Sequence, residues 1–223
     1  MNSLINRIKE SGDKSRLIFN NTRILLKDPL PENINIDEIV KKIESTIPSN
    51  FLYNIDMIYI GQFDILNDRE VSAVYAEGAI YITNVQEDIL DMIDDIVHEV
   101  AHSLEEEFSI DIYGDGQVEA EFLGKRNRLE RIIKSQGYDI LGLNFLESGY
   151  SRELDDFFYK ELGYPLLSTF THGLFDSAYS CTSIREYFAN GFEEFYLRDR
   201  NYLNTISPKL YRKIIDLHNK GDQ

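Results

Sequence analysis

Positive charge is scarce in this sequence. The chain of 223 residues carries 23 Lys and Arg against 39 Asp and Glu, which gives a formal net charge of −16 at pH 7. A protein that binds nucleic acid by neutralising phosphates needs the opposite sign, and an anionic membrane surface is disfavoured for the same reason. The acidity promotes solubility, and it also suits a basic substrate.

Cysteine and long apolar runs are scarce too. Cys181 is the only cysteine, which excludes an intrachain disulfide framework and a cysteine-rich zinc site. We expect it to be a small, partly buried residue. No apolar run is long enough for a transmembrane helix. The N-terminal stretch MNSLINRIKESGDKSR lacks the apolar segment of a secretory signal, so the sequence predicts a cytoplasmic location with no membrane partner.

Residue patterns predict an α+β fold. Hydrophobic residues make up 43% of the chain and charged residues 28%, as in ordinary folded proteins. Apolar residues at helical spacing predict helices over 36–46, 117–135, 151–163, 182–197 and 207–221. Stretches rich in β-branched and aromatic residues predict strands over 55–61, 71–76 and 79–83, with AEGA as a hairpin turn between the last two.

A single domain over residues 1–223 is the expected organisation. We expect an N-terminal helical segment (1–50), a small mixed sheet followed by a long helix (51–108), a helical insertion (109–170) and a helical C-terminal lobe (171–223). Asn84 followed by Glu87 has the spacing of a capping box, so the long helix should begin there and end near Glu107.

The long helix contains the motif H-E-x-x-H, formed by His98, Glu99 and His102. Only four histidines exist in the chain, so two of them at this spacing are unusual. Residues i and i+4 of a helix point the same way, and two such imidazoles can bind one Zn²⁺ ion. Glu99 points elsewhere and can act as general base on a water at the metal.

The side of the helix that carries the histidines has two interpretations. Ile93, Ile96 and Val100 belong to an apolar arc, and the histidines lie opposite it together with Asp91, Asp94, Asp95 and Glu105. One interpretation is a solvated acidic face without a ligand. The other is that this face lines a cleft and that the chain binds one Zn²⁺.

A zinc site of this type needs one more protein ligand. Glu186 lies on the predicted helix 182–197, and its alternative role is an ordinary surface glutamate. Asn190, one turn later, has the position to hydrogen-bond a ligand histidine or to be solvated. His172 is the rival third ligand. His218, near the C-terminus, is expected at the surface.

These motifs resemble a known family. HEVAH followed by AYSCTSIREYFANGFEEFYL resembles the gluzincin zinc peptidases, and in particular the catalytic domain of anthrax lethal factor and the Pro-Pro endopeptidases. The resemblance covers residues 54–108 and 171–197. It implies a zincin-like fold, Glu186 as the third ligand, and Tyr179, seven residues before Glu186, as a donor to the oxyanion. Glu186 lies 84 positions after His102, which is farther than in those relatives, so 109–170 would be inserted.

The predicted activity is zinc-dependent hydrolysis of peptide bonds in a peptide or protein substrate, and the net charge of −16 suits a basic one. The strand EGAIYIT resembles the substrate-side edge strand of the family, which would make Ala79, Ile80 and Tyr81 the substrate strand. An ordinary half-buried strand is the alternative. Two other functions stay open: a catalytically inactive zincin-fold binding or structural module, and a metal-dependent hydrolase of a non-peptide amide.

Overall fold

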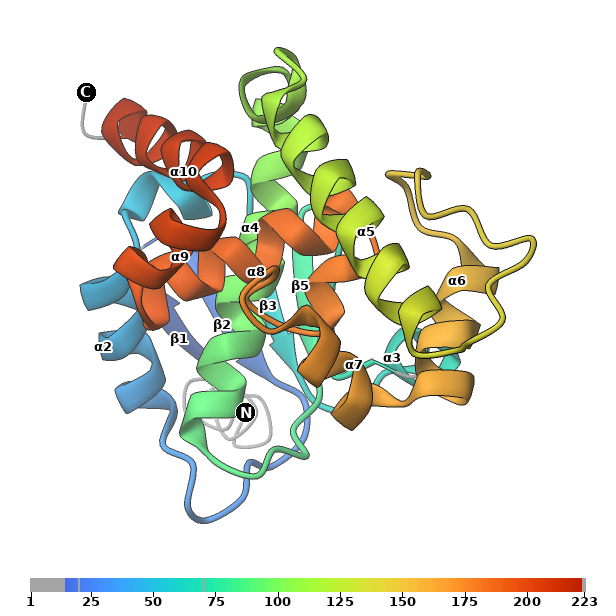
Figure 1. Cartoon of the computed structure of the whole chain (residues 1–223). Coiled ribbons are helices and arrows are strands. Elements are labelled where there is room, and N and C mark those ends of the chain that lie inside the picture. The colour runs from blue at the N-terminus through green and yellow to red at the C-terminus, as the bar shows by residue number, and fades with distance from the viewer. Residues whose placement is uncertain (1–14, 20, 70, 222–223) are drawn as a thin grey trace, which may run out of the picture. The chain divides into compact units, whose positions relative to one another are not determined.

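The computed structural model describes residues 15–19, 21–69 and 71–221 and has the mixed α+β architecture expected from the sequence (Figure 1). The chain divides into two compact units, which consist chiefly of Met1–Glu106 (unit 1) and Glu107–Gly221 (unit 2). The division falls near the predicted change from the sheet and its long helix to the helical region.

Unit 1 contains a five-stranded mixed sheet with the order β1-β2-β3-β5-β4. Strands β2, β3 and β5 run parallel, and the two outer strands, β1 and β4, run antiparallel to their neighbours. The strands are β1 (Ser15–Ile18), β2 (Thr22–Leu26), β3 (Met57–Ile60), β4 (Ala73–Ala76) and β5 (Ala79–Ile82). Ile58, Ile60, Ile80 and Ile82 are fully buried, so every second residue of the two central strands enters the core.

The N-terminal part of unit 1 differs from the prediction of a helical segment over 1–50. Within it, β1 and β2 form strands of the sheet, and residues 1–14 lie outside the described part. Strands of four and five residues are too short for periodicity to separate them from amphipathic helix. The helix predicted over 36–46 is confirmed as α2 (Ile36–Thr46), which is capped by Asn35 and packs on β1.

The hairpin predicted at AEGA is present and joins β4 to β5. Glu77 and Gly78 both have positive φ, 51° and 78°, as the two central residues of a type I′ turn require. β5 therefore lies between β3 and β4, whereas β4 is the outer strand. The expectation that residues 79–83 form an exposed edge is wrong, because the chain reverses after β4 and places β5 inside the sheet.

The long helix α4 (Ile89–Tyr113) carries the H-E-x-x-H motif. It begins later than predicted, because Asp88 rather than Asn84 accepts from the first free amides, those of Leu90 (2.7 Å) and Asp91 (3.2 Å). Asn84 instead donates to the carbonyl of Pro29. Backbone angles leave the helical range at Phe108, close to the predicted end at Glu107, and helical structure then resumes.

Unit 2 is helical throughout its regular structure. Three of its helices match predicted ranges: α5 (Gln117–Ser135), α8 (Ile184–Leu197) and α10 (Pro208–Gly221). The stretch predicted as one helix over 151–163 contains α6 (Arg152–Asp156) and a π-helical segment (Phe157–Leu162). α8 is buried on almost all sides, and it packs against α5, α9 and α10.

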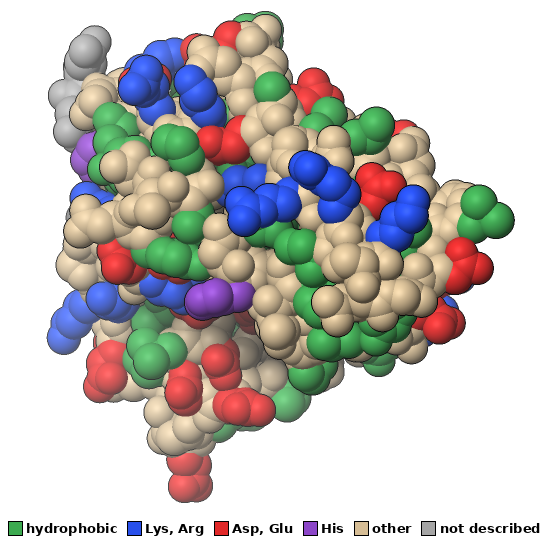
Figure 2. Space-filling model, viewed as in Figure 1, with side chains coloured by type: hydrophobic (Ala, Val, Ile, Leu, Met, Phe, Trp, Pro, Cys, Tyr) green, Lys and Arg blue, Asp and Glu red, His purple; other side chains and the backbone are tan. Residues whose placement is uncertain are grey.

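Several short elements were not predicted. They are α3 (Asp64–Arg69), α7 (Tyr164–Thr171), α9 (Arg200–Ile206) and two 3-10 turns, η1 (Ser49–Leu52) and η3 (Tyr179–Cys181). Within the described ranges, no helix combines the length and apolar character needed to cross a membrane. On the face shown in Figure 2, Lys and Arg side chains lie among Asp and Glu, so this face is not uniformly negative.

Candidate metal centre

The two histidines of the motif converge on one point. Their Nε2 atoms lie 3.2 Å apart, and their ring centroids are 4.8 Å apart. Two nitrogens that bind one zinc tetrahedrally at about 2.0–2.1 Å must lie about 3.3 Å apart. The pair therefore has the separation that a shared tetrahedral ion requires.

Glu105 fixes the orientation of His102. Its Oε2 atom lies 2.7 Å from His102 Nδ1, and both side chains are buried. An ionised carboxylate only accepts hydrogen bonds, so Nδ1 carries the proton and Nε2 keeps the lone pair that a metal ligand needs. The sequence groups Glu105 with the acidic side of the helix, which is solvated or lines a cleft, and does not assign it this role. The i, i+3 spacing of H-x-x-E is the sequence feature that indicates it.

The motif glutamate, Glu99, is buried and bonded to the sheet. Its Oε2 atom accepts from the backbone amide of Tyr75 at 2.6 Å. The amide of Thr83 donates to Ser72, so in this antiparallel pair the amide of Tyr75 points away from β5. The carboxylate thus lies at the outer edge of β4. Glu99, His102 and Glu105 are only 6–8% exposed, whereas Asp91 is exposed, so this side of α4 is solvated at its N-terminal end and buried near the motif.

Glu186 lies in the first turn of α8. Ser183 is the N-cap, and its hydroxyl accepts from the amide of Glu186 at 3.2 Å, so the helix begins at the predicted position. Tyr179 begins the 3-10 turn η3 that precedes α8. Burial, and then the negative charge of Glu186, raise the pKa of the Tyr179 phenol, which keeps it a proton donor.

Asn190 connects α8 with the segment that leads to Tyr179. Its Nδ2 atom donates to the carbonyl of Glu186 at 2.9 Å, and its Oδ1 atom accepts from the hydroxyl of Ser177 at 2.7 Å. The Ser177 hydroxyl also accepts from the amide of Ser180. These bonds hold the segment from Ser177 to Ser180 against the first turns of α8. This role of Asn190 differs from the hydrogen bond to a ligand histidine that the sequence suggested.

One group of His and acidic residues in the described ranges has the composition and spacing to hold a metal ion. It consists of His98, His102 and Glu186, and one ligand atom from each lies within 4.8 Å of the others. Two imidazoles and a carboxylate are a common donor set for zinc. The rival ligand His172 follows α7, is exposed and is not in this group. His218 is partly buried, and its Nδ1 atom lies 2.9 Å from the hydroxyl of Tyr196.

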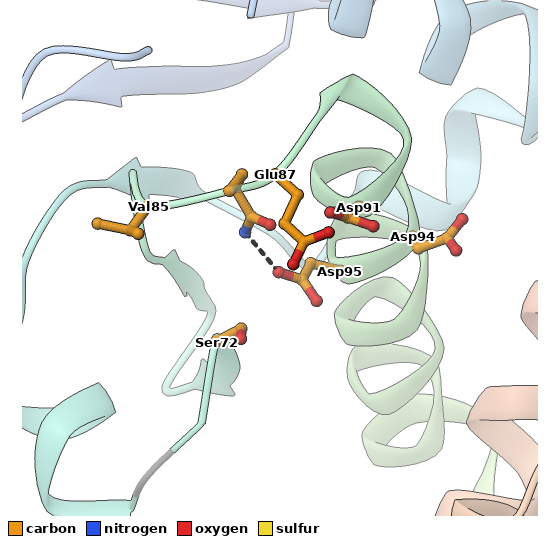
Figure 3. A pocket seen from close by; sticks show the side chains of 7 residues that line it. Ser72, Val85, Glu87, Asp91, Asp94 and Asp95 are labelled. Atoms are coloured by element: carbon orange, nitrogen blue, oxygen red, sulfur yellow. Dashed lines mark hydrogen bonds between the residues drawn. The ribbon is translucent and has the colours of Figure 1, made fainter.

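An acidic pocket of about 660 Å³ lies elsewhere in unit 1 (Figure 3). Asp91, Asp94 and Asp95 line it from the first turns of α4, and Glu87 lines it from the segment that follows β5. The side chain of Gln86 donates to Asp95 at 2.7 Å. The carboxylates give this part of unit 1 a concentrated negative charge.

Comparison of the chain with protein-family models, with curated proteins and with solved structures returns no match. The functional assignment therefore depends on the geometry of the residues described above.

Proposed function

We propose that this chain is a zinc-dependent endopeptidase with a zincin-like fold, in which His98, His102 and Glu186 hold one Zn²⁺ ion. The observation that carries the proposal is the convergence of the two histidines, 3.2 Å apart at Nε2, with Glu105 fixing the tautomer of one of them. The burial of His102 and of its partner Glu105 distinguishes this pair from two solvated surface histidines. The group formed with Glu186 adds the carboxylate that completes a three-ligand set.

The chemistry assigned to the protein's own residues is acid–base catalysis. Bound zinc would lower the pKa of a water molecule to ~7 and would polarise the scissile carbonyl. Glu99 takes the proton of the attacking water and passes it to the leaving amine. Tyr179, a neutral phenol at pH 7 whose raised pKa keeps it protonated at higher pH as well, donates a hydrogen bond to the oxyanion.

The proposed substrate position is the outer edge of β4, in place of the predicted strand at Ala79, Ile80 and Tyr81. The backbone of β4 pairs only with β5 in the described sheet, and on its other side the amide of Tyr75 already donates to Glu99. An extended peptide would therefore pair with the remaining backbone groups of that side. The amide of Tyr75 points outward on that side and reaches Glu99 at 2.6 Å. A peptide added there would lie directly beside the catalytic base.

A peptide or protein substrate with basic residues is favoured by charge. The net charge of −16 attracts positively charged partners over the Debye length, and the acidic pocket adds to this field close to the β5–α4 connection. We propose this substrate preference as a consequence of electrostatics, with no particular side-chain sequence attached to it.

The direct test is digestion of a peptide library by zinc-loaded protein, with products identified by mass spectrometry. We expect internal cleavages that disappear after chelation and return when zinc is added. Intact peptides after incubation with zinc-loaded wild-type protein would contradict the proposed activity and would favour a binding module. Cleavage of small amides without cleavage of peptides would instead identify a different hydrolase.

A further inference from the structure

Arg126, on α5, is a fully buried cation that is only partly hydrogen-bonded. Its Nη1 atom donates to the carbonyl of Cys181 at 2.8 Å and to that of Thr182 at 3.2 Å. Its Nε and Nη2 atoms are buried and have no hydrogen-bond partner among the described residues. The rings of Phe122 and Phe145 lie 5.2 and 5.9 Å from the guanidinium carbon.

This burial carries a cost in free energy. A guanidinium removed from water loses its hydration, and each unused donor loses a further hydrogen bond. Burial lowers the pKa of Arg126 to about 10, which has the same physical cause. An apolar side chain of similar length would avoid both costs, as replacements of buried ionic groups in other proteins have done. Stability alone therefore does not explain an arginine at this position.

The two carbonyls that Arg126 binds lie in a short link of unit 2. This link, residues 179–183, begins with Tyr179 in η3 and ends with Ser183, the N-cap of α8, whose first turn contains Glu186. Tyr179 and Glu186 are therefore attached to opposite ends of the segment that the guanidinium holds. A rotation of the peptide groups at 181 and 182 would redirect both side chains together.

Other hydrogen bonds hold the same segment from its flanks. The amide of Ile184 donates to the carbonyl of Ser148 at 2.8 Å. The hydroxyl of Tyr187 donates to Glu121, on α5, at 2.9 Å. Within the link itself, Thr182 donates to the carbonyl of Tyr179 through its amide and its hydroxyl, both at 2.9 Å. In the described ranges, Arg126 is the side chain of α5 that bonds the middle of the link, so its loss leaves the centre held only by these local bonds.

We propose that Arg126 is a positioning residue that fixes the directions of Tyr179 and Glu186. The inference rests on the proposed function, in which Glu186 binds the metal and Tyr179 donates to the oxyanion. Arg126 itself touches neither the substrate nor the metal. Its contribution to the chemistry is that the metal ligand and the oxyanion donor are held in one orientation before substrate binds.

The neighbouring residue Lys125 offers a matched control. It is also a buried cation on α5, and burial lowers its pKa to about 8. Its Nζ atom donates to the hydroxyl of Ser207 at 2.5 Å and lies 4.6 Å from the centre of the Tyr187 ring. Ser207 precedes α10, so this hydrogen bond leads away from the link.

The test compares wild type with Arg126→Met, Lys125→Met and Glu186→Gln. Zinc affinity is measured by competition with a chromogenic chelator, and the Tm is measured on the metal-free proteins. We expect Arg126→Met to keep or raise the Tm while weakening zinc binding about tenfold or more, the effect typical of residues that orient a ligand. Glu186→Gln should weaken binding further, and Lys125→Met should bind zinc as wild type does.

Two further measurements make the result decisive. Arg126→Lys, which keeps the cation without the planar donor group, is measured beside the Met variant and should bind zinc with intermediate affinity. The kcat of both variants should fall even at saturating zinc, because Tyr179 is also displaced.

The inference is overturned if folded Arg126→Met and Arg126→Lys bind zinc and turn over substrate as wild type does. It is also overturned if zinc affinity and kcat fall only in proportion to a lowered Tm, because Arg126 would then serve only the stability of the fold. Wild-type protein without zinc affinity would overturn the proposed function together with this inference. Zinc binding that is equal in wild type and Glu186→Gln would remove Glu186 from the site and the inference with it.

Discussion

Glu99 and Glu105 lie on the same helix and have different tasks. In the proposed mechanism Glu99 moves protons, whereas the carboxylate of Glu105 is bonded to Nδ1 of His102 and orients the ring. Glu99→Gln keeps the size of the side chain and removes its basicity, so we expect kcat to fall by roughly 10²–10⁴-fold. Zinc content should be unchanged, as measured by elemental analysis of the purified variant.

The control for this prediction is Glu107→Gln, which changes an exposed glutamate of the same helix. It should cleave peptides at the wild-type rate. Undiminished cleavage by Glu99→Gln would remove Glu99 from the mechanism.

Removal of Glu105 should act on the metal rather than on the proton transfer. Glu105→Ala leaves Nδ1 of His102 without its carboxylate, so the ring loses its fixed tautomer and orientation. We expect zinc affinity to fall by about 10–100-fold, with turnover restored at high zinc concentration. The measurement is a zinc titration of activity, and an unchanged zinc midpoint would show that His102 is oriented by other groups.

Asp176 gives a pH dependence that does not involve the metal. Burial raises its pKa from 3.8 to about 6, so the folded protein binds more protons than the unfolded chain between these values. The contribution of Asp176 to stability is therefore greatest at low pH and is lost as pH rises toward about 6. Asp176→Asn should keep the hydrogen bond from Ser180 and remove this dependence.

Thermal unfolding between about pH 4 and 7 tests this prediction. The Tm of Asp176→Asn relative to wild type should rise with pH across that window. A difference that is constant, or that falls with pH, would contradict the buried position of this carboxyl.

At the scale of single residues, the sequence predicted the three residues that the structure brings together, His98, His102 and Glu186, and not the residues that support them. His98, Glu99 and His102 follow a fixed spacing on one helix, so periodicity alone brings them together. The bond between Glu105 and His102 is also local, and it was not predicted because Glu105 was treated as one of several acidic residues on that side of the helix. Arg126 and the amide of Tyr75 contact residues far away in the sequence, and no local pattern encodes such contacts.

Among the secondary-structure elements, apolar spacing predicted three helices of unit 2 best. α5 and α10 have the predicted bounds within a residue or two, and α8 begins two residues after the predicted start at 182. The start of α4 was misplaced because Asn84 donates to Pro29, a contact that depends on the tertiary structure, and Asp88 accepts from the first amides of the helix instead. The position of β5 inside the sheet also depends on pairing with distant strands.

The outer edge of β4 makes a prediction about the substrate backbone. A peptide that adds to this edge forms hydrogen bonds through every second residue, because strand backbones alternate in direction. N-methylation of a cleaved peptide, one residue at a time, should therefore raise KM at alternating positions. Substitution of the side chains should give no such alternation.

The contradicting result is a uniform or irregular effect of N-methylation along the peptide. It would mean that the substrate binds without strand pairing and that the free side of β4 has another use. A peptide already found in the library digest serves as the substrate, so the result is independent of the tested preference for basic residues.

For the whole molecule, composition and residue patterns predicted the α+β class. They did not predict the positions of the short elements. α3, α7 and α9 have six to eight residues each, which is too few turns for a stable periodic pattern. Residues 15–18 and 22–26 form strands because they pair with each other and, for the second strand, with β3. The net negative charge, by contrast, follows from composition alone, so a prediction about charged substrates needs no knowledge of the fold.

The net charge of −16 predicts a dependence on salt. For a peptide with several Lys or Arg residues, kcat/KM should fall as ionic strength rises from about 0.01 to 0.15 M, because the Debye length shrinks from about 30 to 8 Å. A neutral peptide with the same cleavage site is the control and should be nearly insensitive. Equal salt dependence for both peptides would show that charge does not select the substrate.

The central claim is that His98 and His102 bind one zinc ion. It is tested most directly by the metal content of the full chain, purified without chelator or a histidine tag and measured by elemental mass spectrometry. We predict about one zinc per chain, and its loss in His102→Ala. Protein that contains no zinc and takes up none at micromolar concentrations would contradict the claim, and the two histidines would then be neighbours without a shared ligand.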